Sequence, residues 1–166
     1  MKTKKFLPFK RKLQGKTNYR KRLDLLKSNR LRVVVRRSLR NITVQAVEYH
    51  PDGDKTIFSV TSKELKEFGW KGYGRNTPAG YLVGYLFGIK AQQKKINDAI
   101  LDQGLYLTRQ GTITFSVLKG LIDSGMKIPH NAKIFPHEER VEGKHISEEV
   151  AKQFATTKAN IQKVNK

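Results

Sequence analysis

Cysteine is absent from the sequence, and its absence excludes two classes of protein. Domains held by disulfides and zinc sites built on thiolates both need cysteine side chains. Long apolar runs are also missing, since the longest, residues 79–89, is shorter than the ~20 residues that span a bilayer. No apolar signal-peptide segment follows the basic start of the chain. We therefore expect a cytoplasmic protein with no membrane partner.

Acidic residues are few in comparison with basic ones. The chain has 34 Lys and Arg but only 14 Asp and Glu, which gives a formal net charge of +20. Solubility alone needs a net charge of only ~2–8 in a small domain. So high a charge repels itself in the compact state, and a polyanionic partner such as nucleic acid is the simplest reason for it.

The positive charge is concentrated at one end of the chain. Residues 1–40 contain 16 Lys and Arg and a single acid, Asp24, whereas the remaining residues are nearly balanced. The first 17 residues show no hydrophobic periodicity, so we expect them to be disordered alone and to fold on a partner. Phe6 and Phe9 could then stack on unpaired bases. The alternative is a solvated tail whose aromatic rings pack back onto the domain.

A short helix is expected over residues 18–28, with a Thr-Asn pair available as its cap. Tyr19, Leu23 and Leu26 fall on one face of this helix, and basic residues occupy the rest. We expect the apolar edge to pack on the folded domain and the basic side to face phosphates.

Alternating and apolar segments predict the elements of a folded body. Three strand-like segments joined by short turns predict an antiparallel meander over residues 31–37, 42–49 and 56–61. Five further elements follow: a long helix (77–95), a strand (99–101), a second helix (112–124), a short last strand (126–128) and a terminal helix (from 147). This order predicts an α/β layered domain with a mixed sheet and a basic N-terminal extension. Its parts would be a basic RNA-binding arm with a short helix (1–29), an α/β core (30–130), and a C-terminal loop and helix (131–166).

Two features of the body concern its packing. Gly80, Gly84 and Gly88 recur every four residues in the long helix, where each glycine costs ~1 kcal/mol relative to alanine. We expect this stripe to let the helix backbone lie close against the sheet.

Trp70 lies in a loop interrupted by glycines. It either anchors the loop by burial, which is the more common role of tryptophan, or contacts RNA.

Catalysis finds little support in the sequence. A nuclease needs several carboxylates that converge on a divalent metal, and the acids of the body are scattered. The candidate groups are Asp98, Asp102, Asp123, His130, His137 and His145, the last two near Glu138 and Glu139. We expect Asp123 to be a hydrogen-bonding residue at a helix end, and we expect no enzyme, metal, cofactor or small-molecule substrate. A DNA-packaging protein would explain the charge but not a basic arm beside an α/β body.

Several separated motifs occur together in one order. Residues 17–28 run into a basic first strand, Phe68-Gly-Trp70 precedes the helix start at residues 76–82, and residues 99–105 and 122–131 complete the set. Over residues 10–146 the chain resembles the archaeal form of the large-subunit ribosomal protein of the L-eighteen family, which is related to eukaryotic large-subunit protein five. Agreement of several motifs is more specific than any one basic run. The acidic C-terminal extension of some relatives is missing after residue 146.

The resemblance implies a ribonuclease-H-like layered fold without catalysis. It also implies binding of 5S rRNA in the central protuberance of the ribosome, contacts to large-subunit rRNA, and a neighbouring ribosomal protein of the L-five family. Family contacts carried over to this chain, together with Lys4 and Lys5 of the basic arm, give the expected RNA-binding residues as Lys4, Lys5, Lys10, Arg11, Lys12, Lys16, Tyr19, Arg20, Lys21, Arg22, Lys27, Arg30, Arg32, Arg36, Arg37 and Arg40. Tyr19, Phe6 and Phe9 are the candidates for base stacking.

Overall fold

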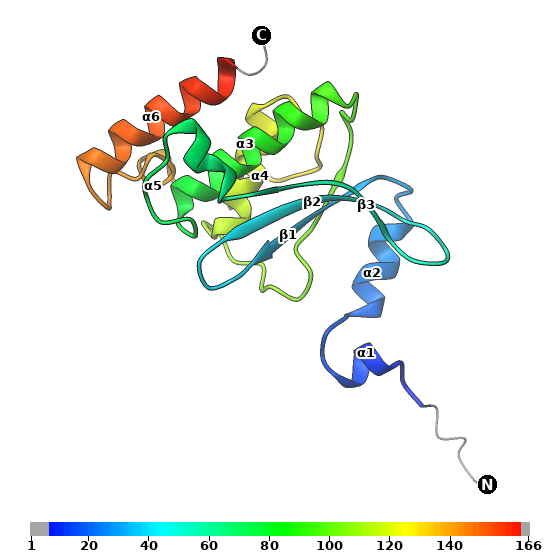
Figure 1. The fold of residues 1–166 in the computed structure, drawn as a ribbon. Coiled ribbons are helices and arrows are strands. Elements are labelled where there is room, and N and C mark those ends of the chain that lie inside the picture. The colour runs from blue at the N-terminus through cyan, green and yellow to red at the C-terminus, as the bar shows by residue number, and fades with distance from the viewer. Residues whose placement is uncertain (1–6, 164–166) are drawn as a thin grey trace, which may run out of the picture.

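A four-stranded mixed sheet, covered by helices on one face, forms the body of the protein (Figure 1). The computed structural model describes residues 7–163. Its strands are β1 (Arg32–Arg37), β2 (Ile42–Glu48), β3 (Lys55–Thr61) and β4 (Ile100–Asp102), in the spatial order β3-β2-β1-β4. The first three strands pair antiparallel, and β4 joins β1 in parallel. This arrangement confirms the predicted meander and the predicted α/β layered class.

The alternation of residues along the strands decides which face of the sheet enters the core. Val33, Val35 and Val44 point to one face and are fully or almost fully buried under the helices. Val34 and Val47 belong to the opposite face, and yet they are buried too. Both line the space between the sheet and the N-terminal arm, so the arm covers part of the face that the helices leave open.

The central helix is α3 (Thr77–Gln93), and most of its residues are buried. Asn76 caps it, because the Asn76 side chain accepts a hydrogen bond of 2.8 Å from the Ala79 N–H, and Pro78 occupies the first turn. The other elements of this layer are η1 (Glu64–Phe68), α4 (Ile113–Asp123), η2 (Ala132–Ile134), α5 (Glu138–Glu142) and α6 (Glu148–Lys163). Of these, η2 and α5 were not predicted. The predicted last strand is reduced to a single parallel bridge between Asp98 and Lys127.

The glycine stripe of α3 faces α4, and the expectation that it faces the sheet is wrong. A Cβ atom at Gly84 would overlap the carbonyl oxygen of Val117 in α4, and one at Gly120 of α4 would overlap backbone atoms of α3. The sheet-facing side of α3 instead carries large side chains, such as Phe87, whose ring stacks on Phe58 of β3 at 4.5 Å between centroids. The two helices therefore approach each other with their backbones nearly in contact.

We expect Gly84→Ala to destabilise the protein strongly and Gly80→Ala to be much milder. Both substitutions gain ~1 kcal/mol of helix propensity. At Gly80 the nearest atom to the new methyl would be the Cγ2 methyl of Ile113, at 3.0 Å, a tight contact that a small shift relieves. At Gly84 the new methyl would overlap the backbone carbonyl oxygen of Val117. Overpacking of this kind costs ~1–3 kcal/mol or more. Thermal unfolding followed by circular dichroism measures the difference, and equal midpoints for the two variants would contradict the close helix contact.

Candidate nucleic-acid interface

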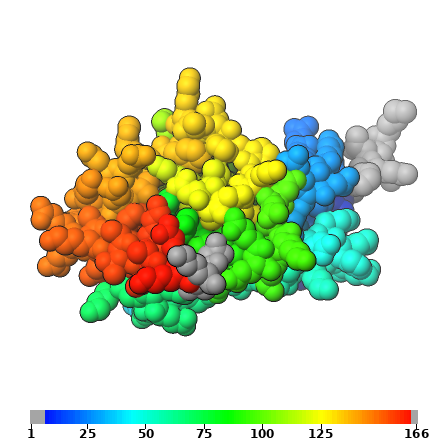
Figure 2. All heavy atoms as spheres, turned by 90° about the horizontal axis from the view of Figure 1, so that it is seen from above, coloured from blue at the N-terminus to red at the C-terminus, as the bar shows by residue number. Residues whose placement is uncertain are grey.

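The N-terminal arm consists of α1 (Lys10–Leu13) and α2 (Tyr19–Leu26) and projects from the sheet side of the body (Figure 1). Figure 2 shows its blue atoms at the opposite end of the molecule from α5 and the start of α6. Asn18 caps α2 by accepting a hydrogen bond of 3.1 Å from the Lys21 N–H, which confirms the predicted helix and cap. The single turn α1 lies where no regular structure was expected, and none of its residues is buried.

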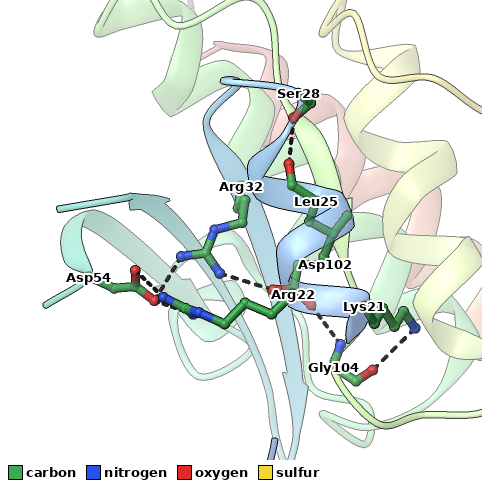
Figure 3. A network of polar contacts seen from close by, with 8 residues as sticks. All are labelled: Lys21, Arg22, Leu25, Ser28, Arg32, Asp54, Asp102 and Gly104. Atoms are coloured by element: carbon green, nitrogen blue, oxygen red, sulfur yellow. Dashed lines mark hydrogen bonds and ion pairs between the residues drawn. The ribbon is translucent and has the colours of Figure 1, made fainter. Parts of the chain in front are cut away.

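One carboxylate joins the arm to the sheet (Figure 3). Asp54, in the turn between β2 and β3, accepts two hydrogen bonds from the Arg22 guanidinium of α2, at 2.7 and 2.8 Å. The same carboxylate lies 2.7 Å from Nη2 of Arg32 in β1, an ion pair without hydrogen-bond geometry. Arg32 Nη1 in turn donates to Asp102 of β4 at 3.2 Å. We call these four residues, Arg22, Asp54, Arg32 and Asp102, the arm clamp.

The position of Arg32 corrects its selection as an RNA-binding residue. Its side chain is only 3% exposed and lies between two carboxylates, so no phosphate can reach it in this structure. A guanidinium so deeply buried needs such partners, because an unpaired buried charge is strongly destabilising. Arg22 is also occupied, by its bidentate contact to Asp54. Both arginines therefore hold the arm in place.

The clamp is charged at any physiological pH. The hydrogen bonds from Arg22, together with the positive charge of Arg32 close by, lower the pKa of Asp54 to about 2, against an opposing effect of burial. The same contact raises the pKa of Arg22.

A second connection between the arm and the body lies beside the clamp. Lys21 Nζ donates to the Gly104 carbonyl at 3.2 Å, and the Gly104 N–H donates to Asp102 at 2.9 Å.

Most of the other predicted basic residues are exposed. Lys21 and Arg37 are half-buried, Lys4 and Lys5 lie outside the described residues, and the exposed ones are Lys10, Arg11, Lys12, Lys16, Arg20, Lys27, Arg30, Arg36 and Arg40. Lys27 and Arg30 have exposed acidic neighbours, Asp24 and Asp98, each at 3.3 Å. Such exposed pairs contribute little energy, so a phosphate can displace them readily.

A groove lies between the arm and the open face of the sheet, with a volume of about 1000 Å³. The arm contributes Arg11, Lys16 and Lys21 to its wall, and the sheet contributes Arg36 and Gln45. The acids at the groove, which are those of the clamp, are neutralised by their arginines. The groove is therefore positively charged, which suits a phosphate backbone.

Tyr106 is a part of the site that the sequence analysis missed. The Arg37 guanidinium lies 4.1 Å from the centre of the Tyr106 ring. The Tyr106 hydroxyl donates to the Arg37 carbonyl at 3.0 Å and accepts from the Arg37 N–H at 3.2 Å. This hydroxyl thus satisfies backbone groups at the end of β1 and fixes the cation above the ring. Nothing in the sequence indicates a pairing between residues so far apart.

The aromatic residues take different roles from those expected. Phe9 and Tyr19 contact each other, with centroids 5.0 Å apart, and so join α1 to α2; Phe6 lies outside the described residues. Phe9 is still 70% exposed and remains available to a base. The predicted apolar edge of α2 is only partly correct, because Leu23 is 57% exposed. Trp70 is 2% exposed, which confirms the role of a buried loop anchor.

The groups considered for catalysis do not converge. Within residues 7–163, no three His, Asp or Glu side chains come together in an arrangement that could hold a metal ion. Asp98 and Asp102 pair with arginines, and Asp123 accepts a hydrogen bond of 2.7 Å from the Tyr81 hydroxyl, the helix-end role expected for it. In the same part of the chain, no helix is long and apolar enough to cross a membrane.

We expect Asp54→Asn to loosen the arm while the body remains folded. The substitution removes the carboxylate charge that Arg22 and Arg32 share. At a partly solvated site, the loss of this contact should reduce the stability of the docked arm by about 1 kcal/mol. Amide hydrogen exchange of α2 should accelerate by about fivefold, with α3 unchanged. Asp24→Asn, which removes an exposed acid of the same helix, is the matched control. Identical exchange of α2 in the two variants would show that the clamp does not hold the arm.

The Asp54 pKa itself can be tested by an NMR titration of its side-chain carboxyl carbon. The midpoint should lie at about 2 in the wild type and move toward the ordinary value of 3.8 in Arg22→Gln. Because the folded-state pKa is lowered, the clamp stabilises the protein fully above about pH 4, and this contribution is lost as the pH falls toward 2. An unshifted midpoint in the wild type would rule out the paired carboxylate.

Comparison with known proteins agrees with this geometry. The model of the family described as ribosomal large subunit proteins 60S L5 and 50S L18 matches residues 4–99. Two archaeal proteins named large ribosomal subunit protein uL18 are similar over 140 residues, which is 84% of this chain and 72% of each relative. The identity is 46% for the protein from Methanococcus maripaludis and 47% for that from Methanosphaera stadtmanae. Proteins of this family are structural components of the ribosome and not enzymes, and the chain belongs to this family of large-subunit ribosomal proteins.

Proposed function

We propose that the protein binds 5S rRNA and attaches it to large-subunit rRNA in the central protuberance of a cytoplasmic ribosome. The observation that carries the proposal is the positively charged groove between the arm and the open sheet face. Family membership supports the ribosomal setting. A ribosomal protein of the L-five family is the proposed protein neighbour, and no small molecule or membrane is needed.

The arm supplies phosphate contacts in a defined direction. Lys10, Arg11, Lys12 and Lys16 are exposed along α1 and the connection to α2. Arg11 is also oriented, since its Nε donates to the Thr17 hydroxyl at 2.9 Å. Phosphate contacts position a protein on RNA but do not read sequence. Arg11 and Lys16 line the groove, and Lys10 and Lys12 are exposed beside them on α1. Because the arm clamp fixes α2 on the sheet, these cations can select RNA by its shape.

Base contacts would come from the aromatic and apolar part of the arm. Phe9 lies exposed against Tyr19, and Leu13 and Leu23 are exposed nearby on α1 and α2. Apolar side chains that remain in water beside many cations fit unpaired bases, which offer a flat apolar face. This combination explains why a ribosomal protein would keep apolar groups on an arm that buries none of them.

Neutralising the arm should weaken binding of 5S rRNA and reduce its salt dependence. In a variant with Lys10, Arg11, Lys12 and Lys16 changed to Gln, the slope of log affinity against log salt should fall by about 3, at ~0.7–0.9 for each contact. Filter binding over a salt series measures this slope. Substitution is preferable to deletion of residues 1–22, which would also remove Arg22 and with it the clamp.

The control variant carries the same four charge losses far from the arm, at Lys133, Arg140, Lys152 and Lys163, which are all exposed. Its slope should stay within one unit of the wild type. The wild type should prefer 5S rRNA to an unrelated RNA and to duplex DNA at physiological salt. Equal affinity for all three nucleic acids would refute the proposed function, and an equal loss in both variants would refute the role of the arm.

A further inference from the structure

A second basic surface lies away from the groove, where the β1–β2 turn meets the loop after η1. We call it the hairpin–loop surface and define it as residues 38–41 and 70–75. The Tyr73 hydroxyl donates a hydrogen bond to the Leu39 carbonyl. Gly74 lies so close to the Arg40 carbonyl oxygen that a Cβ atom there would be 2.9 Å from it. These contacts join residues that are 34 positions apart in the sequence, so the two segments form one surface.

Three cations of this surface have no acidic partner. Arg40 and Lys71 are exposed and Arg75 is half-buried. Among residues 7–163, no carboxylate lies within ion-pair distance of any of the three. Among residues 7–163, Lys90, Lys119 and Lys144 are the lysines after residue 40 that have an acidic partner, so unpaired cations are common in the body. The three cations of this surface differ from the others because they lie together on two segments that contact each other. The unpaired charge favours an anion from outside the chain.

The surface is held firmly in shape by contacts beneath it. Trp70 is buried, and a Cβ atom at Gly72 would lie 2.7 Å from the Trp70 ring, so the loop backbone runs directly over the indole. On the hairpin side, the Ser62 hydroxyl donates to the Asn41 side chain and accepts from the Ile42 N–H, both at 3.2 Å. Cations on a pre-formed surface lose little conformational freedom when they bind.

The arm clamp and the hairpin–loop surface lie at opposite ends of β1, and the groove runs along the strand from the clamp as far as Arg36. The arm clamp holds the first residue of this strand, Arg32, whereas the β1–β2 turn follows its last residue, Arg37. Six residues of strand span roughly 20 Å. In Figure 1, the β1–β2 turn lies at the left end of the strands and α2 lies to their right. None of residues 38–41 and 70–75 lines the groove, so an RNA segment held by the arm leaves the hairpin–loop surface free for another.

We propose that the hairpin–loop surface binds the phosphate backbone of a second RNA segment while the arm holds the first. This inference rests on the proposed function and assigns the attachment to large-subunit rRNA to Arg40, Lys71 and Arg75. Only Leu39 and Tyr73 are large exposed apolar groups there. A protein partner would need a larger apolar centre, whereas phosphates need cations on a firm support, as found here. The exposed Tyr73 ring, fixed through its hydroxyl, offers a place for one unpaired base to stack.

The test separates the two RNA segments in one experiment. Labelled 5S rRNA is saturated with protein, and its capture by immobilised large-subunit rRNA is measured over a salt series. The resemblance predicts that Arg40 contacts RNA, but Arg40 does not line the groove, so the proposal assigns it to the second RNA segment. A variant with Arg40, Lys71 and Arg75 changed to Gln should therefore bind 5S rRNA within about twofold of the wild type. Its capture should be weaker by tenfold or more, with a salt slope lower by about 2, as three lost phosphate contacts predict.

The matched control changes Lys133, Lys152 and Lys163 to Gln and should be captured like the wild type. Thermal unfolding of all variants checks that they are folded. The inference is overturned if the Arg40, Lys71 and Arg75 variant is captured normally, if it loses 5S binding in parallel, or if the wild-type complex is not captured at all. Failure of the proposed function looks different, because the wild type would then show no preference for 5S rRNA.

Discussion

The carboxylate of Asp54 is the interaction on which the arrangement of the basic residues depends. It lies in a turn between two strands, and it binds one arginine from the arm and one from the central strand of the sheet. Helix α2 has no fully buried residue, so apolar packing alone does not fix its position. A shared charged contact of good geometry, supported by the Lys21 contact to Gly104, supplies the orientation instead. The groove exists because the arm stands at this angle to the sheet.

The rigid packing of the α/β body keeps the arm in a fixed position relative to the rest of the protein. The backbones of α3 and α4 meet at Gly84 and Gly120, and α3 fills the inner face of the sheet with large side chains such as Phe87. Close packing of this kind leaves little room for internal movement. The sheet can therefore hold the arm at one end of β1 and the hairpin–loop surface at the other in a fixed relation.

The elements of the fold could be predicted well where the signal is local. Alternation along residues 42–48, the Asn76-Thr-Pro start of α3 and the glycine after α4 are all local signals, and each marks the expected element. The partner of the glycine stripe could not be predicted, since periodicity shows that a face is narrow but not what it meets. Helix α5 was missed for another reason, since its five residues are too few to show a periodic pattern.

The candidate site was predicted in outline and not in detail. The charge asymmetry indicated the arm, but a list of basic residues does not separate those that face solvent from those that hold the structure. Arg32 looks like its neighbours in the sequence, and only its partners Asp54 and Asp102, which are distant along the chain, show that it is buried. Tyr106 was missed because its role is defined entirely by its contact with Arg37.

The arm clamp also means that the net charge of the chain does not by itself predict its affinity for RNA. Loss of Asp54 in a relative would make the chain more basic, and a simple count of charges would rank such a protein as the stronger binder. The structure implies the reverse for selective recognition, since two released guanidiniums on a loosened arm would attract any polyanion without favouring one shape. Under the proposed function, Asp54 is thus a determinant of specificity, and its retention would be a better marker of RNA binding than the number of lysines and arginines.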